Sequence, residues 1–159
     1  MKQLTTTLNK IKAHSPCESG WKKLLKHLGK TKADDEVLPF SVILESNGLD
    51  DALWCCRSAP EYTREWRLFA VWCALQVKNL MTDKRNLNVL KVAENFANGL
   101  ATQAELAAAR DAARNAARDA ARGAAWDAAW TATRAAARAA QKEVFLWIVS
   151  GEFAKWEGR

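Results

Sequence analysis

The segment from Glu105 to Gln141 constrains the fold more than any other part of the chain. Alanine fills most of it, and a large side chain returns at every fourth position. Alanine has the highest helix propensity of all residues, so the segment predicts a long α-helix. The large side chains form a row that we call the Arg/Trp row: Arg110, Arg114, Arg118, Arg122, Trp126, Trp130, Arg134 and Arg138.

A four-residue repeat does not keep its members on one face of a helix. Four residues turn about 400°, so each step drifts about 40° around a straight helix. Arg110 and Trp130 therefore point to nearly opposite sides. The Arg/Trp row is a spiral ridge, and its two parts, 110–122 and 126–138, cannot both face one flat neighbour. The alanines between them form parallel ridges on which other helices can pack closely.

The length of this segment predicts an interruption. One straight helix over residues 103–149 would span about 70 Å, because an α-helix rises about 1.5 Å per residue. A compact domain of this chain length has a diameter of only roughly 40 Å. Glycine costs about 1 kcal/mol relative to alanine inside a helix. We therefore expect a kink or break near Gly123, the one glycine inside the repeat.

Start and stop signals divide the rest of the chain into short helices. Leu4, Leu8 and Ile11 share one face of a first helix. Ser15, followed by Pro16 and then Glu18, has the spacing of a capping box. Further helices are expected at about 16–28, 38–47, 50–58, 63–81 and 83–97, with Asp50, Thr63 and Asp83 as N-caps and with Gly29, Asn47-Gly48 and Asn98-Gly99 as stops. Thr102 and Glu105 form a second capping box before the repeat.

No stretch of the chain alternates β-branched and polar residues, so we expect no sheet. The predicted fold class is all-α, a compact bundle of seven or eight helices with a long alanine-rich C-terminal helix. The 159 residues suit a single domain. Its expected parts are a short-helix bundle over 1–100, the long helix or a helical hairpin over 102–149, and a tail over 150–159.

Charge is distributed unevenly along the chain, whose net charge is +6. Residues 1–30 and the alanine-rich segment are basic, and residues 31–66 form an acidic block. Two interpretations remain open. The acidic block can face the arginines inside the fold, or the basic faces can bind an acidic partner, either protein or nucleic acid.

The sequence contains no constellation typical of catalysis or metal binding. His14, Cys17, Cys55 and Cys56 are the candidates for zinc ligands, but adjacent cysteines chelate poorly and no Cys-x-x-Cys occurs. We expect the four cysteines to be buried structural thiols. No spacing suggests a nucleophile and its base, so we predict a protein that is not an enzyme and needs no cofactor or metal.

The chain has no segment that predicts export or membrane insertion. Its N-terminus lacks the apolar stretch of a signal peptide, and its longest strongly apolar run, residues 144–149, is too short to span a bilayer. We expect a cytoplasmic protein that keeps its thiols reduced and does not bind membranes.

Three stretches of the chain are distinctive: ESNGLDDALW at Glu45–Trp54, REWRLFAVWCA at Arg64–Ala74, and the AAAR and AAW units within Glu105–Ala140. In these stretches the chain resembles a family of small helical proteins of bacteria and phages that are described as immunity proteins. The resemblance implies stoichiometric neutralisation of a toxin. The phage context implies inhibition of a host defence system, for example one of CRISPR type. The family supplies no functional residues that could be carried over.

The leading hypothesis is therefore a non-enzymatic inhibitor that binds a toxin or a host defence protein. The chain has eight tryptophans, and tryptophan and arginine are enriched at binding hot spots. The candidate contact residues are the Arg/Trp row and Trp156. The alternative is a basic nucleic-acid-binding protein that uses the N-terminal lysines and the arginines. A third hypothesis is a structural protein whose alanine ridges pair between two copies as a homodimer.

Overall fold

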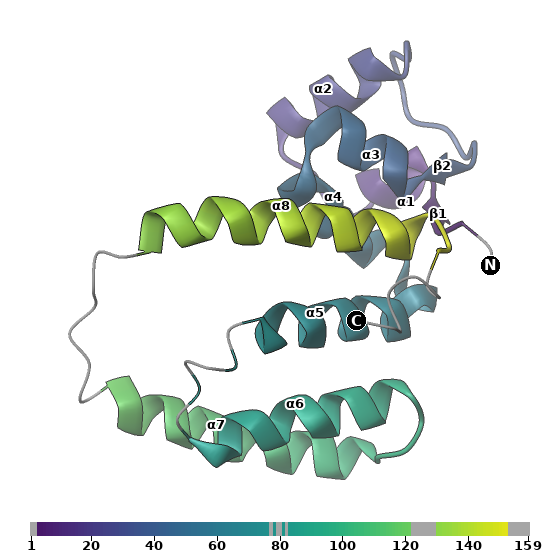
Figure 1. Cartoon of the computed structure of the whole chain (residues 1–159). Helices are drawn as coiled ribbons and strands as arrows, with labels where there is room; N and C mark the ends of the chain where they lie inside the picture. The colour runs from purple at the N-terminus through teal and green to yellow at the C-terminus, as the bar shows by residue number, and fades with distance from the viewer. Residues whose placement is uncertain (1–2, 77, 79–80, 82, 122–129, 153–159) are drawn as a thin grey trace. The chain divides into compact units, whose positions relative to one another are not determined.

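The computed structural model of the chain describes residues 3–76, 78, 81, 83–121 and 130–152, with the backbone alone over 116–121 and 130–136. Over this part of the chain it has eight α-helices and one very short two-stranded sheet (Figure 1). The predicted all-α class is confirmed. The predicted kink at Gly123 lies outside the described residues.

The chain divides into two compact units. Unit 1 comprises Met1–Tyr62 and Ala139–Arg159, and unit 2 comprises Thr63–Arg138. The single domain expected from the chain length stays a prediction.

Unit 1 is built from short elements and the second half of the last helix. Its elements are β1 (Thr5–Thr6), α1 (Leu8–Lys12), α2 (Glu18–His27), β2 (Leu38–Pro39), α3 (Phe40–Asn47), α4 (Leu49–Cys55), the 3₁₀ helices η1 (Cys56–Ser58) and η2 (Pro60–Tyr62), and the part of α8 (Trp130–Val149) that follows residue 138. The core consists of side chains that are almost fully buried, among them Leu8, Ile11, Phe40, Ile43, Phe145, Ile148 and Val149.

The expectation of no sheet is wrong in one place. Thr5 and Thr6 pair antiparallel with Pro39 and Leu38. Leu4, expected in the first helix, precedes this strand, and its N–H donates to the Val149 carbonyl at 2.8 Å. Leu4 is buried as predicted but in extended backbone. The partners lie far away in the chain, so no local pattern could reveal them.

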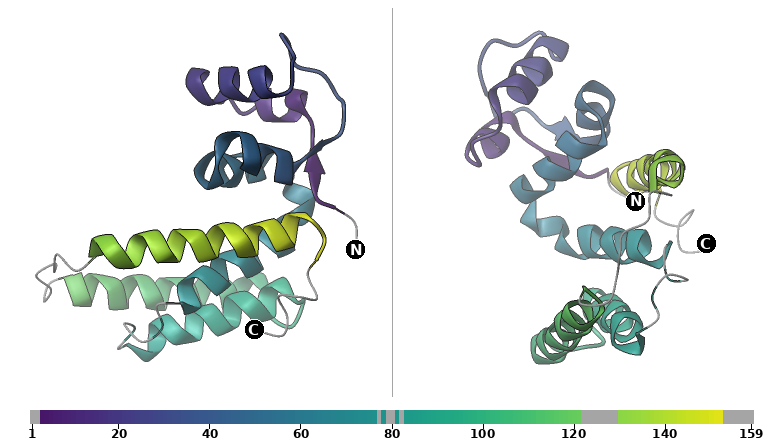
Figure 2. Two further views of the ribbon diagram at one scale, coloured as in Figure 1. Left: turned by 45° about the horizontal axis from the view of Figure 1, so that its top comes forward. Right: turned by 90° about the vertical axis from the view of Figure 1, so that its left-hand side faces the viewer.

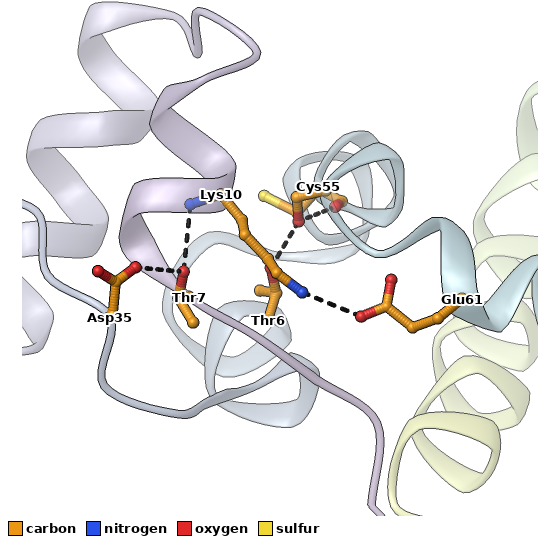
Figure 3. A network of polar contacts seen from close by, with 7 residues as sticks. Thr6, Thr7, Lys10, Asp35, Cys55 and Glu61 are labelled. Atoms are coloured by element: carbon orange, nitrogen blue, oxygen red, sulfur yellow. Dashed lines mark hydrogen bonds and ion pairs between the residues drawn. The ribbon is translucent and has the colours of Figure 1, made fainter.

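A polar network fastens the N-terminal segment to the end of α4 and to η2 (Figure 3). The hydroxyls of Thr6 and Ser58, both buried, lie 2.8 Å apart, and Ser58 also donates to the Cys55 carbonyl at 2.7 Å. Lys10 donates to Glu61 at 3.0 Å. Because buried hydroxyls are costly without partners, this network fixes how β1 and α4 meet.

Part of the acidic block forms ion pairs with N-terminal lysines. In the described residues of the block, Glu61 pairs with Lys10, and Asp34 and Glu36 both pair with Lys30 at 2.6 Å. The hydrogen bonds that the Lys30 ammonium donates to Asp34 and Glu36 raise the pKa of Lys30. The structure thus supplies a local match for part of the acidic block within unit 1.

Unit 2 consists of α5 (Thr63–Leu75), α6 (Lys84–Ala97) and α7 (Gln103–Ala121), together with the first residues of α8. The helices α6 and α7 lie side by side as a hairpin, and α5 also contacts α6 (Figures 1 and 2). The buried side chains of the unit are Leu68, Phe69, Val71, Leu106 and Ala109. Both residues from α7 lie on one stripe, three positions apart, so the small alanine lets α7 pack closely on its neighbour.

Most helix boundaries follow the predicted signals. Asp83 caps α6 by accepting from the Arg85 N–H at 2.8 Å. Thr102 and Glu105 form the predicted capping box before α7, with the Thr102 N–H donating to Glu105 at 2.7 Å and the Glu105 N–H donating to the Thr102 hydroxyl at 3.2 Å. The stops at Gly29, Gly48 and Gly99 are confirmed by their positive φ angles.

Three predicted N-caps are wrong. The helix α5 begins at Thr63 itself and ends at Leu75, so Thr63 lies in its first turn and the helix stops before the predicted residue 81. Ser15 has a φ of 55°, and α2 begins at Glu18 after Cys17, so the first capping box does not form. The Ser15 N–H bonds to the Lys12 carbonyl, which makes the residue part of the turn that ends α1. The helix α4 begins at Leu49 after Gly48, which places Asp50 and Asp51 in the first turn, where the helix dipole still favours acids.

Candidate partner-binding site

The first part of the Arg/Trp row lies at the surface of unit 2. Arg110 and Arg114 on α7 are exposed, while Leu106 and Ala109 of the same helix are buried. Because the apolar stripe is already covered, these arginines belong to the displayed side of the helix. Arg114 pairs with Asp111 at 3.5 Å, an (i, i+3) contact along α7.

The structure places the other predicted contact residues less completely. Arg138 on α8 is half-buried. Arg118 lies on α7 and Trp130 and Arg134 lie on α8, each described by its backbone alone. Arg122, Trp126 and Trp156 lie outside the described residues. The interface role of these residues stays a prediction.

Beside Arg110, unit 2 contains a groove of about 380 Å³. It is lined by Thr63, Trp66, Arg67, Ala70 and Val71 of α5, by Leu90 and Ala93 of α6, and by Arg110 of α7. The volume falls in the usual range of ligand sites in proteins, roughly 300–1,000 Å³. Apolar and aromatic side chains make most of the lining, and two guanidinium groups supply the charge.

Arg67 is held in place by packing. Its guanidinium carbon lies 4.7 Å from the ring centroid of Phe96, a cation–π arrangement. The side chain is half-buried. Burial lowers the pKa of Arg67, and the positive charge of Arg110 lowers it further. Among the described residues, neither Arg67 nor Arg110 forms an ion pair.

The sequence pointed to Arg110 but not to its neighbours in the groove. Trp66 is half-buried and lines the groove. Arg67 carries no local signal, because only the packing of α5 on α6 and α7 brings it close to Arg110. Every tryptophan whose side chain is described (Trp21, Trp54, Trp66, Trp72 and Trp147) is half-buried, so none of these is a purely interior residue.

A second, smaller pocket of about 120 Å³ lies within unit 1. It is lined by Ile11, Pro16, Cys17, Gly20, Trp21, Leu24, Ile43, Asn47, Asp51, Trp54 and Cys55. The Asn47 amide donates to the Gly20 carbonyl at 2.9 Å and to Asp51 at 2.7 Å. These bonds join α2, α3 and α4 around the pocket, and they occupy both amide protons of Asn47.

The thiols are not all buried as expected. Cys55 is buried, Cys56 and Cys73 are half-buried, and Cys17 is exposed. Burial raises the pKa of Cys55 and Cys56 to about 12 and that of Cys73 to about 11. At neutral pH these three sulfurs are therefore protonated, and a protonated thiol is a weak nucleophile and a weak metal ligand. In the described residues, no group of three or more His, Cys, Asp and Glu side chains is arranged to hold a metal ion.

Among the described helices, none combines the length and the apolar character needed to cross a bilayer.

Comparison of the chain with known proteins yields no match to a family model, to a curated protein or to a solved structure.

Proposed function

We propose that this protein is a non-enzymatic inhibitor that neutralises another protein by stoichiometric binding. The target is a toxin, as for an immunity protein, or a component of a bacterial defence system, for example one of CRISPR type, as for a phage counter-defence protein. The observation that carries the proposal is the display of Arg110 and Arg114 on α7 next to a groove lined by Trp66 and Arg67.

The composition of this surface supports protein binding. Arginine and tryptophan are the side chains most enriched among residues that dominate binding energy. Arginine presents a planar fork of donors that matches a carboxylate with two parallel hydrogen bonds. Half-buried Trp66 offers a large rigid apolar surface that loses little entropy on binding.

The chemistry of the groove also weighs against a catalytic role. Its polar lining consists of Thr63, Arg67 and Arg110. An arginine stays protonated and cannot serve as the base that would activate a hydroxyl. The raised pKa values of Cys55, Cys56 and Cys73 keep these thiols unreactive. The proposed compartment is the cytoplasm, where the four free cysteines stay reduced.

The test is capture of the partner from a nuclease-treated lysate of a bacterial host, with mass spectrometry and then a titration of the purified partner. We expect one protein in integral stoichiometry with the wild-type chain. The double variant Arg110→Gln/Arg114→Gln no longer binds this protein, because it lacks the two charges of the Arg/Trp row that the structure describes as exposed. The control Lys22→Gln/Lys23→Gln removes two exposed charges of α2 in unit 1 and retains the partner.

Failure to recover any stoichiometric protein contradicts the proposal, as does equal binding by the two double variants. The nucleic-acid alternative predicts a different pattern. Capture would be lost on nuclease treatment, and binding to DNA or RNA would weaken steeply with salt, because phosphate contacts release counterions.

A further inference from the structure

Two positively charged side chains from different helices line the groove of unit 2. Arg67 comes from α5 and Arg110 from α7, and both line the same groove. Arg67 is half-buried against the Phe96 ring, so its charge has lost part of its hydration. Like charges brought together repel, and the repulsion grows as water is removed. An anion placed between the two guanidinium groups would relieve it.

The rest of the groove selects among anions. Trp66, Ala70, Val71, Leu90 and Ala93 give it an apolar wall from α5 and α6. The volume of about 380 Å³ exceeds what one small inorganic ion fills. An anion that also carries a bulky apolar group therefore uses the whole groove, whereas a bare phosphate leaves the apolar wall in water.

A protein segment meets these requirements better than a nucleic-acid backbone. Nucleic acids bind rows of exposed cations that follow the phosphates. On the described part of α7, Asp111 stands between Arg110 and Arg114 in the sequence, pairs with Arg114 and would repel a phosphate chain. Arg110 next to the apolar wall remains as the cation that faces the groove, together with Arg67.

Building on the proposed function, we infer that the groove between α5, α6 and α7 receives a segment of the partner protein in which an acidic side chain stands next to a bulky apolar one. The carboxylate is bound by Arg67 and Arg110. The apolar neighbour packs against Trp66, Val71 and Leu90.

The test uses the full-length chain and two synthetic peptides that differ only in charge. The first is Ac-Gly-Leu-Glu-Phe-Glu-Gly-NH₂, and the second has glutamine in place of both glutamates. Binding is measured by titration, and the indole N–H signal of Trp66 is followed by NMR. We expect the acidic peptide to bind about tenfold more tightly than its isostere, since charge-assisted hydrogen bonds are the strong ones. We also expect it to shift the Trp66 signal.

Three variants locate the effect. Arg110→Gln, at an exposed position, and Arg67→Gln each bring the affinity for the acidic peptide to within about twofold of that for the glutamine peptide. Arg57→Gln is the matched control, because Arg57 also stacks on an aromatic ring, with its guanidinium carbon 4.3 Å from the Trp54 centroid, but lies in unit 1. It leaves the preference unchanged. Circular dichroism verifies that each variant is folded.

Equal affinity for the two peptides overturns the inference, as does an unchanged preference in folded Arg67→Gln and Arg110→Gln. A short oligothymidine that binds more tightly than the acidic peptide and displaces it assigns the groove to nucleic acid and overturns the inference too. The proposed function fails separately, when no protein is captured in stoichiometric amount. If the captured partner still binds Arg67→Gln and Arg110→Gln with full affinity, the groove is not its contact and the groove inference alone is overturned.

Discussion

At the scale of single residues, Gly20 lowers the helix propensity of α2 but allows close packing between helices. It lies inside α2 without a positive φ, so backbone conformation does not demand glycine there. A Cβ at this position would lie 2.8 Å from the Asp51 carboxylate and 3.1 Å from the Cys17 sulfur. The glycine therefore lets α2 approach α4 while Asp51 keeps its hydrogen bond to Asn47.

The variant Gly20→Ala tests this reasoning. In a helix free of obstruction, the change adds about 1 kcal/mol of stability. Here we expect none of that gain, because the new methyl must displace the Asp51 carboxylate from Asn47. In an Asp51→Ala background the same change becomes stabilising by about 1 kcal/mol. Urea unfolding of the four proteins of the cycle measures this. A stabilisation of wild type as large as that in the Asp51→Ala background contradicts the account.

Residue-level reasoning from the sequence located only part of the candidate site. The sequence named Arg110 and Arg114 as candidates, but it left open which part of the Arg/Trp row is exposed, and the structure shows both side chains exposed. Trp66 and Arg67 could not be assigned to the same site, because their proximity to Arg110 depends on how three helices pack. No spacing within α5 distinguishes a tryptophan that lines a groove from one in a core.

At the scale of elements, local sequence determined the helix ends that depend on local hydrogen bonds. Asp83 and the pair Thr102 and Glu105 bond to backbone within three residues, so they could be recognised by spacing. Ser15 has the spacing of a capping box but lies in left-handed backbone, because its N–H bonds to the Lys12 carbonyl in the turn that ends α1. The pairing of Thr5 and Thr6 with residues 38 and 39 was missed because it is non-local.

The capping box of α7 makes stability depend on pH in a defined direction. The Thr102 backbone N–H and hydroxyl lower the pKa of Glu105 below its ordinary value of 4.5. A carboxylate with a depressed pKa contributes stability that is fully present above the ordinary value and is lost as the pH falls through the lowered one. We therefore expect Glu105→Gln to unfold at a lower temperature than wild type at pH 7. The two midpoints should converge as the pH falls below about 4.5.

Thermal unfolding followed by circular dichroism across this pH range measures the effect. The control is Glu143→Gln, which removes an exposed carboxylate from α8 without removing a cap. If the unfolding midpoints of Glu105→Gln and wild type differ by the same amount from neutral to acid pH, the charge of Glu105 has no part in capping α7.

At the scale of the whole molecule, the two compact units differ in how much they bury. Among the residues whose side chains are described, nearly all of the largest fully buried ones lie in unit 1, and Leu106 is the one from unit 2. In the described part of unit 2, α6 has no buried side chain, and its Leu87 is 40% exposed. Elements with few buried apolar contacts open at lower free energy than core elements.

Hydrogen exchange followed by mass spectrometry tests this difference. We expect the amides of α3 and of the last turns of α8 to be the slowest to exchange, and those of α6 to exchange faster by at least tenfold. Addition of the purified partner should slow exchange in α5, α6 and α7, because the proposed groove lies between them. Protection confined to α2 and α4 on binding would place the partner at the unit 1 pocket instead.

Ion pairs occur in both units. In unit 1, Lys10 and Lys30 are matched by Glu61, Asp34 and Glu36. In the described residues of unit 2, Arg67 and Arg110 stand together at the groove. The sequence left open whether the acidic block pairs with basic residues of the fold or whether the basic faces bind an acidic partner. The three carboxylates named pair with lysines of the same unit.

The central claim is that a protein partner is bound through the displayed arginines and the groove beside them. Isothermal calorimetry, with the captured partner titrated into four forms of the chain, tests this claim most directly. They are wild type, Arg67→Gln, Arg110→Gln and Arg57→Gln. The account predicts integral stoichiometry with wild type and Arg57→Gln, and a loss of about tenfold or more in affinity with each groove variant. Equal affinity in all four, or no stoichiometric binding by wild type, would contradict it.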